Sequence, residues 1–292
     1  MKTSEELKKL VQEKYGEIAN QEDGSCCTPT AGNEEVYHMM TDDYTKIEGY
    51  QAAADLGLGC GLPTQFAKIQ KGDTVIDLGS GAGNDCFVAR HETGESGKVI
   101  GIDFTEAMIQ KARINAEKLG FNNVEFRKGD IEDMPVSDNM ADVIVSNCVL
   151  NLVPDKEKVI QEIYRTLKPG GHFSISDIVL VGDLPEALKL DAEMYAGCVS
   201  GAIQKGDYIS HIKEAGFIDI VIQKEKPIDL PDNILDRYLN ESQKEVFRSG
   251  KTGIFSITVF AQKSGIKPLK IHSNSIGNQT DNCSPGAPSG CC

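Results

Sequence analysis

The sequence predicts a doubly wound α/β fold, in which a mostly parallel sheet carries helices on both faces. From about residue 73 onward, short apolar segments typical of buried strands alternate with amphipathic helical segments. The first such strand, Thr74–Leu78, runs into the glycine-rich turn Gly79-Ser-Gly-Ala-Gly83. A turn of this kind between a strand and a helix is typical of α/β domains that bind nucleotides.

Before this domain the chain predicts an amphipathic helix and then irregular structure. Thr3 and Glu6 form the pattern of a capping box. Five apolar residues follow at helical spacing: Leu7, Leu10, Val11, Tyr15 and Ile18. The segment 37–63 is mixed and ends rich in glycine, which predicts a turn with unusual backbone angles.

Seven strands and four further helices are expected after this point. The strands are Thr74–Leu78, Val99–Asp103, Val124–Arg127, Asp142–Ser146, His172–Asp177, Phe217–Gln223 and Gly253–Gln262. The helices are Thr105–Leu119, Lys156–Leu167 (closed by Pro169-Gly170-Gly171), Leu188–Tyr195 and Tyr208–Ala215. The alternation of strand and helix becomes irregular after Asp177.

Charge and cysteine content exclude several classes of protein. The net charge of −14 argues against binding to nucleic acid or to an anionic membrane. No apolar run approaches the length of a transmembrane helix, and the charged N-terminus lacks the core of a signal peptide. We therefore expect a cytoplasmic protein, and a monomer. Its nine cysteines are then mostly thiols, and without a CxxC pair a structural zinc site is not expected.

The glycine turn and the residues after the next strands predict a site for S-adenosylmethionine. Gly79, Gly81 and Gly83 allow close backbone approach, and the following helix N-terminus supplies N–H donors. Asp103 ends the next strand at the distance expected for a carboxylate that binds ribose. Alternatively, Asp103 only caps the next helix, although Thr105 could do that unaided.

The spacing GxGxG, with Asn84 in place of the last glycine of GxGxxG, favours S-adenosylmethionine over NAD. Asp77 could accept a hydrogen bond from the methionyl amine. Asp130 and Ile131, after the third strand, are placed to hold adenine, although Ile131 equally suits an ordinary core position. Three further residues complete the predicted cofactor site: Ser80, Phe104 and Asn147.

Cys148 is the candidate reactive group, because it lies at the end of the fourth strand, where ligands bind in such sheets. The segment Ser146-Asn147-Cys148 is not the Asn-Pro-Pro-Tyr arrangement that grips planar amines, and no His or Lys stands beside it as a base for a hydroxyl. A lone cysteine is also often a small buried hydrophobe. Cys86 fits that description, and we assign it no role.

Three cysteine motifs together resemble the arsenite S-adenosylmethionine methyltransferases, over about residues 10–263: Ser146-Asn-Cys-Val-Leu-Asn-Leu152, Gly59-Cys-Gly61 and Gly197-Cys-Val-Ser-Gly201. The opening that runs from Tyr15 to Cys26-Cys27 is similar to the bacterial branch. The resemblance implies the class I methyltransferase fold, a Rossmann-like seven-stranded sheet with an antiparallel last strand. It also implies arsenite and methylarsenite as substrates, a role in arsenic detoxification, and a thiol reductant such as glutathione or thioredoxin.

The resemblance assigns the cysteines as well. Cys148 and Cys198 are implied to bind arsenic(III) throughout, with Cys60 as third ligand. One of Cys26 and Cys27 is implied to be the redox partner of Cys60. Soft arsenic suits thiolates, and no general base is needed because arsenic loses no proton.

Two other functions stay open. A carbon methyltransferase of the quinone or sterol type would not need Cys60, Cys148 and Cys198 together. A non-catalytic thiol-based arsenic binder need not bind S-adenosylmethionine. The expected domains are an N-terminal segment (1–65), a cofactor domain (66–180), an arsenic-binding and sheet-completing region (181–263) and a disordered tail (264–292). The tail cysteines, which either capture arsenic or are idle, are Cys283, Cys291 and Cys292.

Overall fold

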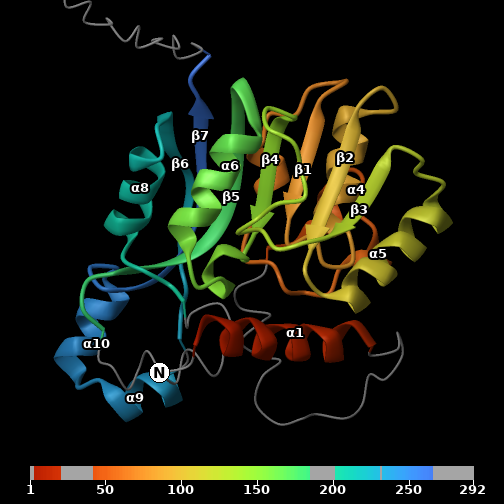
Figure 1. Ribbon diagram of the computed structural model, residues 1–292. Coiled ribbons are helices and arrows are strands. Elements are labelled where there is room, and N and C mark those ends of the chain that lie inside the picture. The colour runs from red at the N-terminus through yellow and green to blue at the C-terminus, as the bar shows by residue number, and fades with distance from the viewer. Residues whose placement is uncertain (1–2, 21–41, 185–200, 231, 266–292) are drawn as a thin grey trace, which may run out of the picture.

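A computed structural model describes residues 3–20, 42–184, 201–230 and 232–265 of the 292-residue chain. Its centre is a seven-stranded sheet in the order β3-β2-β1-β4-β5-β7-β6 (Figure 1). Strands β1 to β5 are parallel, and β7 is antiparallel to both β5 and β6, as predicted. The strands are β1 (Thr74–Leu78), β2 (Lys98–Asp103), β3 (Val124–Lys128), β4 (Ala141–Asn147), β5 (Leu167–Val181), β6 (Phe217–Pro227) and β7 (Gly253–Lys263).

Helices cover both faces of the sheet. They are α1 (Ser4–Asn20), α3 (Pro63–Phe66), α4 (Asn84–Thr93), α5 (Glu106–Leu119), α6 (Lys156–Thr166), α8 (Lys205–Glu214), α9 (Asp232–Tyr238) and α10 (Glu241–Arg248), with 3-10 turns η1 (Tyr44–Lys46), η2 (Ala52–Ala54) and η3 (Leu150–Leu152). Local signals set their ends: Asp155 caps α6 through Lys158 N–H, and Gly120 in the left-handed conformation ends α5.

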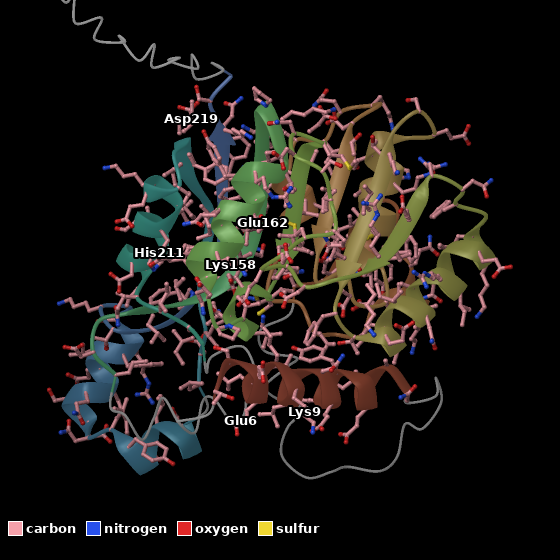
Figure 2. All side chains as sticks on the ribbon, viewed as in Figure 1. Glu6, Lys9, Lys158, Glu162, His211 and Asp219 are labelled. Carbon is pink, nitrogen blue, oxygen red and sulfur yellow. The ribbon has the colours of Figure 1, made fainter. Side chains whose placement is uncertain are left out.

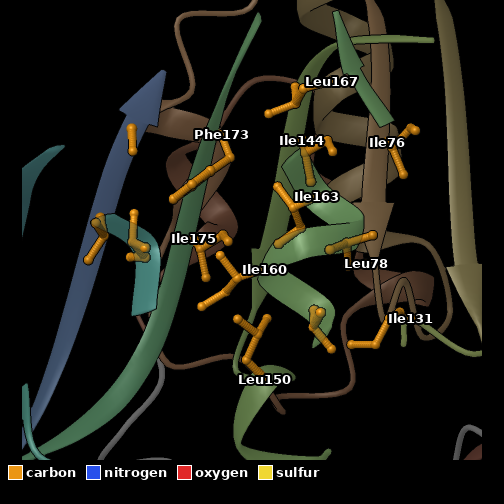
Figure 3. Packing of buried hydrophobic residues seen from close by; sticks show 14 of the residues in the cluster. Ile76, Leu78, Ile131, Ile144, Leu150, Ile160, Ile163, Leu167, Phe173 and Ile175 are labelled. Atoms are coloured by element: carbon orange, nitrogen blue, oxygen red, sulfur yellow. The ribbon is translucent and has the colours of Figure 1, made fainter. Parts of the chain in front are cut away.

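Successive residues of each central strand point to opposite faces, so the sheet separates two cores. Ile76 and Ile144 pack with residues of α6 and α8 on one face, and Figure 3 shows Ile160 and Ile163 of α6 against this layer. On the other face, the valines of the same strands pack against α4 and α5. Because both faces are buried, successive residues of these strands are apolar and do not alternate with polar ones.

Helix α1 lies across the edge where the parallel strands end (Figure 1). Its capping box is present, since Thr3 and Glu6 exchange hydrogen bonds of 2.7 and 3.3 Å. The expected apolar face is partly wrong, because Leu7 and Leu10 are 38% and 48% exposed. Lys8 turns to the protein instead, where Asp130 and Glu132 attract it. Figure 2 shows Glu6 and Lys9 on the side of α1 away from the sheet.

The expectation for the Pro-Gly-Gly segment is also wrong. Helix α6 ends at Thr166, and 169–171 belong to β5, at a register irregularity where Ala141 pairs with Leu167 but Val143 pairs with His172. Helices α9 and α10 were not predicted. The helix expected at 188–195 lies outside the described residues.

Candidate active site

A cavity opens at the carboxyl edge of the sheet, between the glycine turn and the end of β4. Backbone of the glycine turn, carboxylates and apolar side chains line it together, the mixed lining that is typical of small-molecule sites. Nine of the ten predicted cofactor residues lie on its wall: Asp77, Gly79, Ser80, Gly81, Asp103, Phe104, Asp130, Ile131 and Asn147. The tenth, Gly83, is not among the lining residues. It caps α4 at φ 99°, where a Cβ would lie 2.8 Å from the Phe87 ring.

Gly79 and Gly81 of the turn both have positive φ, which side chains disfavour, and a side chain on Gly79 would also collide with Val149. Gly79 has φ 67°, and a Cβ on it would lie 2.4 Å from the Val149 side chain. Gly81 has φ 49°, also in the left-handed region. The backbone of the turn therefore borders the cavity directly.

Asp103 holds this turn together with the start of α5. Its carboxylate accepts hydrogen bonds from the N–H groups of Gly81 (3.0 Å) and Thr105 (2.8 Å). The Thr105 side chain makes no capping bond, so the expectation that Thr105 caps α5 unaided is wrong. Burial raises the pKa of Asp103, although the two backbone N–H groups oppose this effect. Asp103 thus bonds two backbone N–H groups and also lines the cavity.

Two more buried carboxylates make the cavity strongly acidic. Burial, reinforced by the charge of Asp85, raises the pKa of Asp77 well above its ordinary value, while the Cys86 thiol donates to Asp77 at 3.3 Å. Burial also raises the pKa of Asp85 to about 6, against hydrogen bonds from Tyr44 (2.9 Å), Asn147 and Thr64. Closely spaced buried carboxylates favour a cationic ligand, because its charge relieves their repulsion.

Unsatisfied polar atoms on the cavity wall fit a polar ligand. Ser80 Oγ, Asn84 Oδ1 and Thr105 Oγ1 are buried and have no hydrogen-bond partner among the described residues. Buried polar atoms are normally paired in folded proteins. Three such atoms around one cavity suit a ligand with several donors and acceptors, such as the hydroxyl, amine and ring nitrogen groups of a nucleoside.

Two of the predicted thiols meet in an apolar cluster beside this cavity. Cys60 and Cys148 are both buried, together with leucines of α9 and of the segment before it. Cys148 has φ 61°, a left-handed conformation that is uncommon for a non-glycine residue, and its N–H donates to the Ser176 carbonyl at 2.8 Å. Cys148 also lines the cavity, so the thiol cluster and the cavity share a wall.

The glycines around Cys60 are explained by close packing on β4 and β5. A Cβ on Gly59 would lie 2.6 Å from Asn147 Nδ2, and one on Gly61 would lie 2.5 Å from Ser176 Oγ. The motif Gly-Cys-Gly therefore lets the Cys60 loop lie flat against the ends of these strands.

The second glycine–cysteine motif reaches the same region through its last residue. A Cβ on Gly201 would lie 1.9 Å from the Asn151 carbonyl oxygen. Asn151 in turn donates to Asp177 (2.8 Å) and to the Ile178 carbonyl (2.7 Å). Burial raises the pKa of Asp177 to about 7, and Tyr208 donates to its other oxygen at 3.3 Å.

The third predicted ligand, Cys198, and the predicted redox partners of Cys60, Cys26 and Cys27, lie outside the described residues, as do the three tail cysteines. Within the described ranges, no group of three or more His, Cys, Asp or Glu side chains could hold a metal ion.

Several residues of the site were not predicted. Lys8, Tyr15, Tyr44 and Asp85 line the cavity. The position of Asp85 in the first turn of α4, two residues after Gly83, was a usable signal. Tyr44 gave no signal, since it contacts Asn147, 103 residues away in the sequence.

Known proteins with similar sequences and structures agree with this geometry. Residues 69–216 match the "Methyltransferase domain" family. The chain is 41% identical to the arsenite methyltransferase of Halobacterium salinarum (81% of this chain, 64% of that protein) and 30% identical to that of Homo sapiens (85% and 69%). It thus spans less than two thirds of the Halobacterium protein.

A solved structure agrees as well. The crystal structure of an arsenic(III) S-adenosylmethionine methyltransferase from Chlamydomonas reinhardtii superposes with a TM-score of 0.59 at 32% identity, over 80% of this chain and 75% of that one. The fold is thus the predicted class I methyltransferase fold. The chain belongs to the methyltransferase-domain family and, within it, to the arsenite methyltransferases.

Proposed function

We propose that this protein methylates arsenic(III), with S-adenosylmethionine as the methyl donor. The observation that carries the proposal is the burial of Cys60 and Cys148 in one apolar cluster, with Cys148 also on the wall of a cavity built from a glycine turn and buried carboxylates. A carbon methyltransferase has no need of two buried thiols at this place.

The cavity residues suit S-adenosylmethionine in type and position. Asp77 would accept from the methionyl amine and Asp103 from the ribose hydroxyls, while Ile131 would pack on adenine beside Asp130. The buried carboxylates would favour the sulfonium charge over neutral analogues. When bound, this cofactor supplies an electrophilic methyl group.

Arsenic(III) would be held by thiolates of Cys148, Cys198 and Cys60, which match its softness. Gly201 packs on Asn151, and each of these residues is three positions from a proposed ligand, Cys198 and Cys148 respectively. Three residues of chain span at most about 11 Å. Cys198 is therefore on a short enough tether to join Cys148, and its thiolate would complete the site.

The electron balance explains the further cysteines. When the arsenic lone pair forms the bond to the methyl carbon, arsenic is formally oxidised by two electrons. Cys60 and one of Cys26 and Cys27 would return two electrons by forming a disulfide. A cellular thiol such as glutathione or thioredoxin would then reduce that disulfide. Among the described residues, none of the helices has the length and hydropathy of a membrane span. Separately, the charge pattern of the sequence leads us to propose a cytoplasmic monomer.

The test is to incubate the protein with arsenite, glutathione and labelled S-adenosylmethionine, and then to separate the arsenic species. Labelled methylarsenic species are expected. Binding of arsenic and cofactor without methyl transfer would instead indicate a binding protein. Methylation of a quinone in place of arsenite would support the carbon methyltransferase.

A further inference from the structure

One side chain links the two thiol-bearing segments. Asn147 Oδ1 accepts from the N–H of Cys60 (3.0 Å), and its Nδ2 donates to the carbonyl of Gly61 (2.9 Å). Two hydrogen bonds from one carboxamide to adjacent residues fix both the position and the direction of the Cys60 loop, much as a paired strand would.

The Asn147 carboxamide is itself held in one orientation. Its Nδ2 donates to Tyr44 Oη (2.6 Å) and lies 3.3 Å from Asp85 Oδ2, while Tyr44 donates to Asp85 at 2.9 Å. These acceptors require the nitrogen on their side and therefore leave the oxygen for Cys60 N–H. Exchange of the two ends would place the amide N–H against the Cys60 N–H, and the amide oxygen against the Gly61 carbonyl and Asp85.

Asn147 also precedes Cys148 directly, and the backbone of Cys148 is fixed by its N–H bond to Ser176. Ser256 of β7 also donates to the Cys60 carbonyl (2.5 Å), but Asn147 is the side chain that bonds the Cys60 loop directly to the residue before Cys148. Although Asn147 borders the cavity, as a cofactor residue would, both ends of its carboxamide are engaged by the Cys60 loop and its supports.

We propose that Asn147 is a positioning residue that fixes Cys60 against Cys148 and so creates the three-thiolate state that arsenite requires. This inference rests on the arsenic function proposed above. Methylarsenite already carries one carbon ligand and needs only two thiolates. Loss of the Asn147 link should therefore impair the two substrates unequally, whereas general damage to the fold would impair both.

The test compares Asn147→Leu and Asn147→Asp with Asn123→Asp. Asn123 is a matched control, because its Nδ2 also donates to two backbone carbonyls, those of Gly94 and Gly97 (both 2.9 Å), and it is not among the cavity residues. The kcat/KM of Asn147→Leu for arsenite should fall roughly a hundredfold, as for loss of buried hydrogen bonds, and that for methylarsenite less than about fivefold. Asn147→Asp keeps the acceptor for Cys60 but sets a carboxylate oxygen against the Gly61 carbonyl and Asp85, so it too should lower the arsenite value more than the methylarsenite value. Asn123→Asp should leave the ratio of the two values unchanged.

A second measurement does not depend on turnover. X-ray absorption is measured with one equivalent of arsenite on protein in which the tail residues Cys283, Cys291 and Cys292 are changed to Ser. It should give three sulfur ligands with Asn147 in place and two in Asn147→Leu, and the Kd for S-adenosylhomocysteine reports separately any effect on the cofactor cavity. The proposal would be overturned if kcat/KM fell equally for arsenite and methylarsenite, or if arsenic kept three sulfur ligands in both folded variants, Asn147→Leu and Asn147→Asp. Failure of the arsenic function itself would appear separately, as a wild type that makes no methylated arsenic.

Discussion

At the scale of single residues, the conformation of Cys148 shows that the position is not optimised for stability. A non-glycine residue at φ 61° costs about 1–2 kcal/mol, and glycine would adopt this conformation without that cost. A thiol retained there is consistent with a chemical role. The linear motif predicted Cys148 and Asn147, but not their partner Tyr44, because the contact joins residues far apart in the chain.

Two substitutions of Cys148 separate the thiol from the backbone strain. Cys148→Ala and Cys148→Gly should both abolish methylation of arsenite and methylarsenite, because each removes a proposed arsenic ligand, while S-adenosylhomocysteine still binds. The free energy of unfolding of Cys148→Gly should exceed that of Cys148→Ala by about 1 kcal/mol, so Cys148→Gly should unfold at a higher denaturant concentration. Substantial turnover by either variant would exclude Cys148 as an obligatory ligand.

Asp177 gives a prediction on pH. Its folded-state pKa is about 7, raised by burial from an ordinary value of 3.8 even though Lys156 opposes the shift. The folded state therefore binds this proton more tightly, so the stabilisation is complete below about pH 4 and is lost as the pH rises through 7.

Asp177→Asn keeps the shape and cannot ionise. At pH 8 the variant should be more stable than the wild type by a few kcal/mol, at about 1.4 kcal/mol for each pH unit between the two pKa values. At pH 4 the two should be equal. Denaturant unfolding at both pH values checks this, and a variant less stable than wild type at pH 8 would contradict it. The raised pKa values of Asp77, Asp85 and Asp103 are common to both proteins and cancel.

At the scale of elements, the predicted strands and helices agree with the structure where the local sequence pattern determines the element. They differ where contacts with distant parts of the chain determine it. Strands buried on both faces were recognisable from their apolar runs. The length of β5 was not, because it follows from antiparallel pairing with β7 from His172 to Val181. Helices α9 and α10 have only 7 and 8 residues, too few for a clear period. In α1, charges more than 120 residues away turned Lys8 inward.

Helix α1 should help to retain the cofactor, because Lys8 and Tyr15 line the cavity and Gln12 donates to the Phe104 carbonyl at 3.2 Å. Lys8→Gln removes the ion pairs to Asp130 and Glu132 and should raise the Kd for S-adenosylhomocysteine about three- to tenfold, mainly through faster dissociation.

Lys9→Gln is the matched control for Lys8→Gln. Lys9 lies on the same helix with its side chain 76% exposed, and its nearest acidic partner is Glu13 at 3.8 Å. This change should leave the Kd unaltered. Stopped-flow dissociation and calorimetric titration measure both variants, and equal effects of the two changes would show that α1 acts only through general charge.

At the scale of the whole molecule, the carboxyl edge of the sheet has two separate covers. Helix α1 lies over the acidic cavity, while Leu235 of α9 and Phe247 of α10 pack in the thiol cluster. Figure 1 shows α1, α9 and α10 at the same end of the sheet. The cavity with its buried carboxylates and the packed apolar cluster that holds the thiols therefore meet at Cys148, which suits a reaction between a cationic donor and a soft acceptor.

The sheet closes without the tail. The last strand ends at Lys263, whose Nζ donates to the carbonyls of Tyr164 (2.6 Å) and Leu167 (2.7 Å). Residues 266–292 lie outside the described residues, and their composition offers little apolar surface to bury. Removing them should leave Tm and the Kd for S-adenosylhomocysteine nearly unchanged.

The tail cysteines should matter only for collecting arsenic. Removal of 266–292 should lower the number of arsenic atoms bound per chain and slow turnover at scarce arsenite, because Cys291 and Cys292 are adjacent and can share one arsenic atom. A full-length control with Cys283, Cys291 and Cys292 changed to Ser should reproduce both effects. Elemental analysis of arsenic per chain and rates over a range of arsenite concentrations measure them. If the truncated protein unfolds while this control does not, the tail is structural; if neither changes the stoichiometry, its cysteines do not bind arsenic.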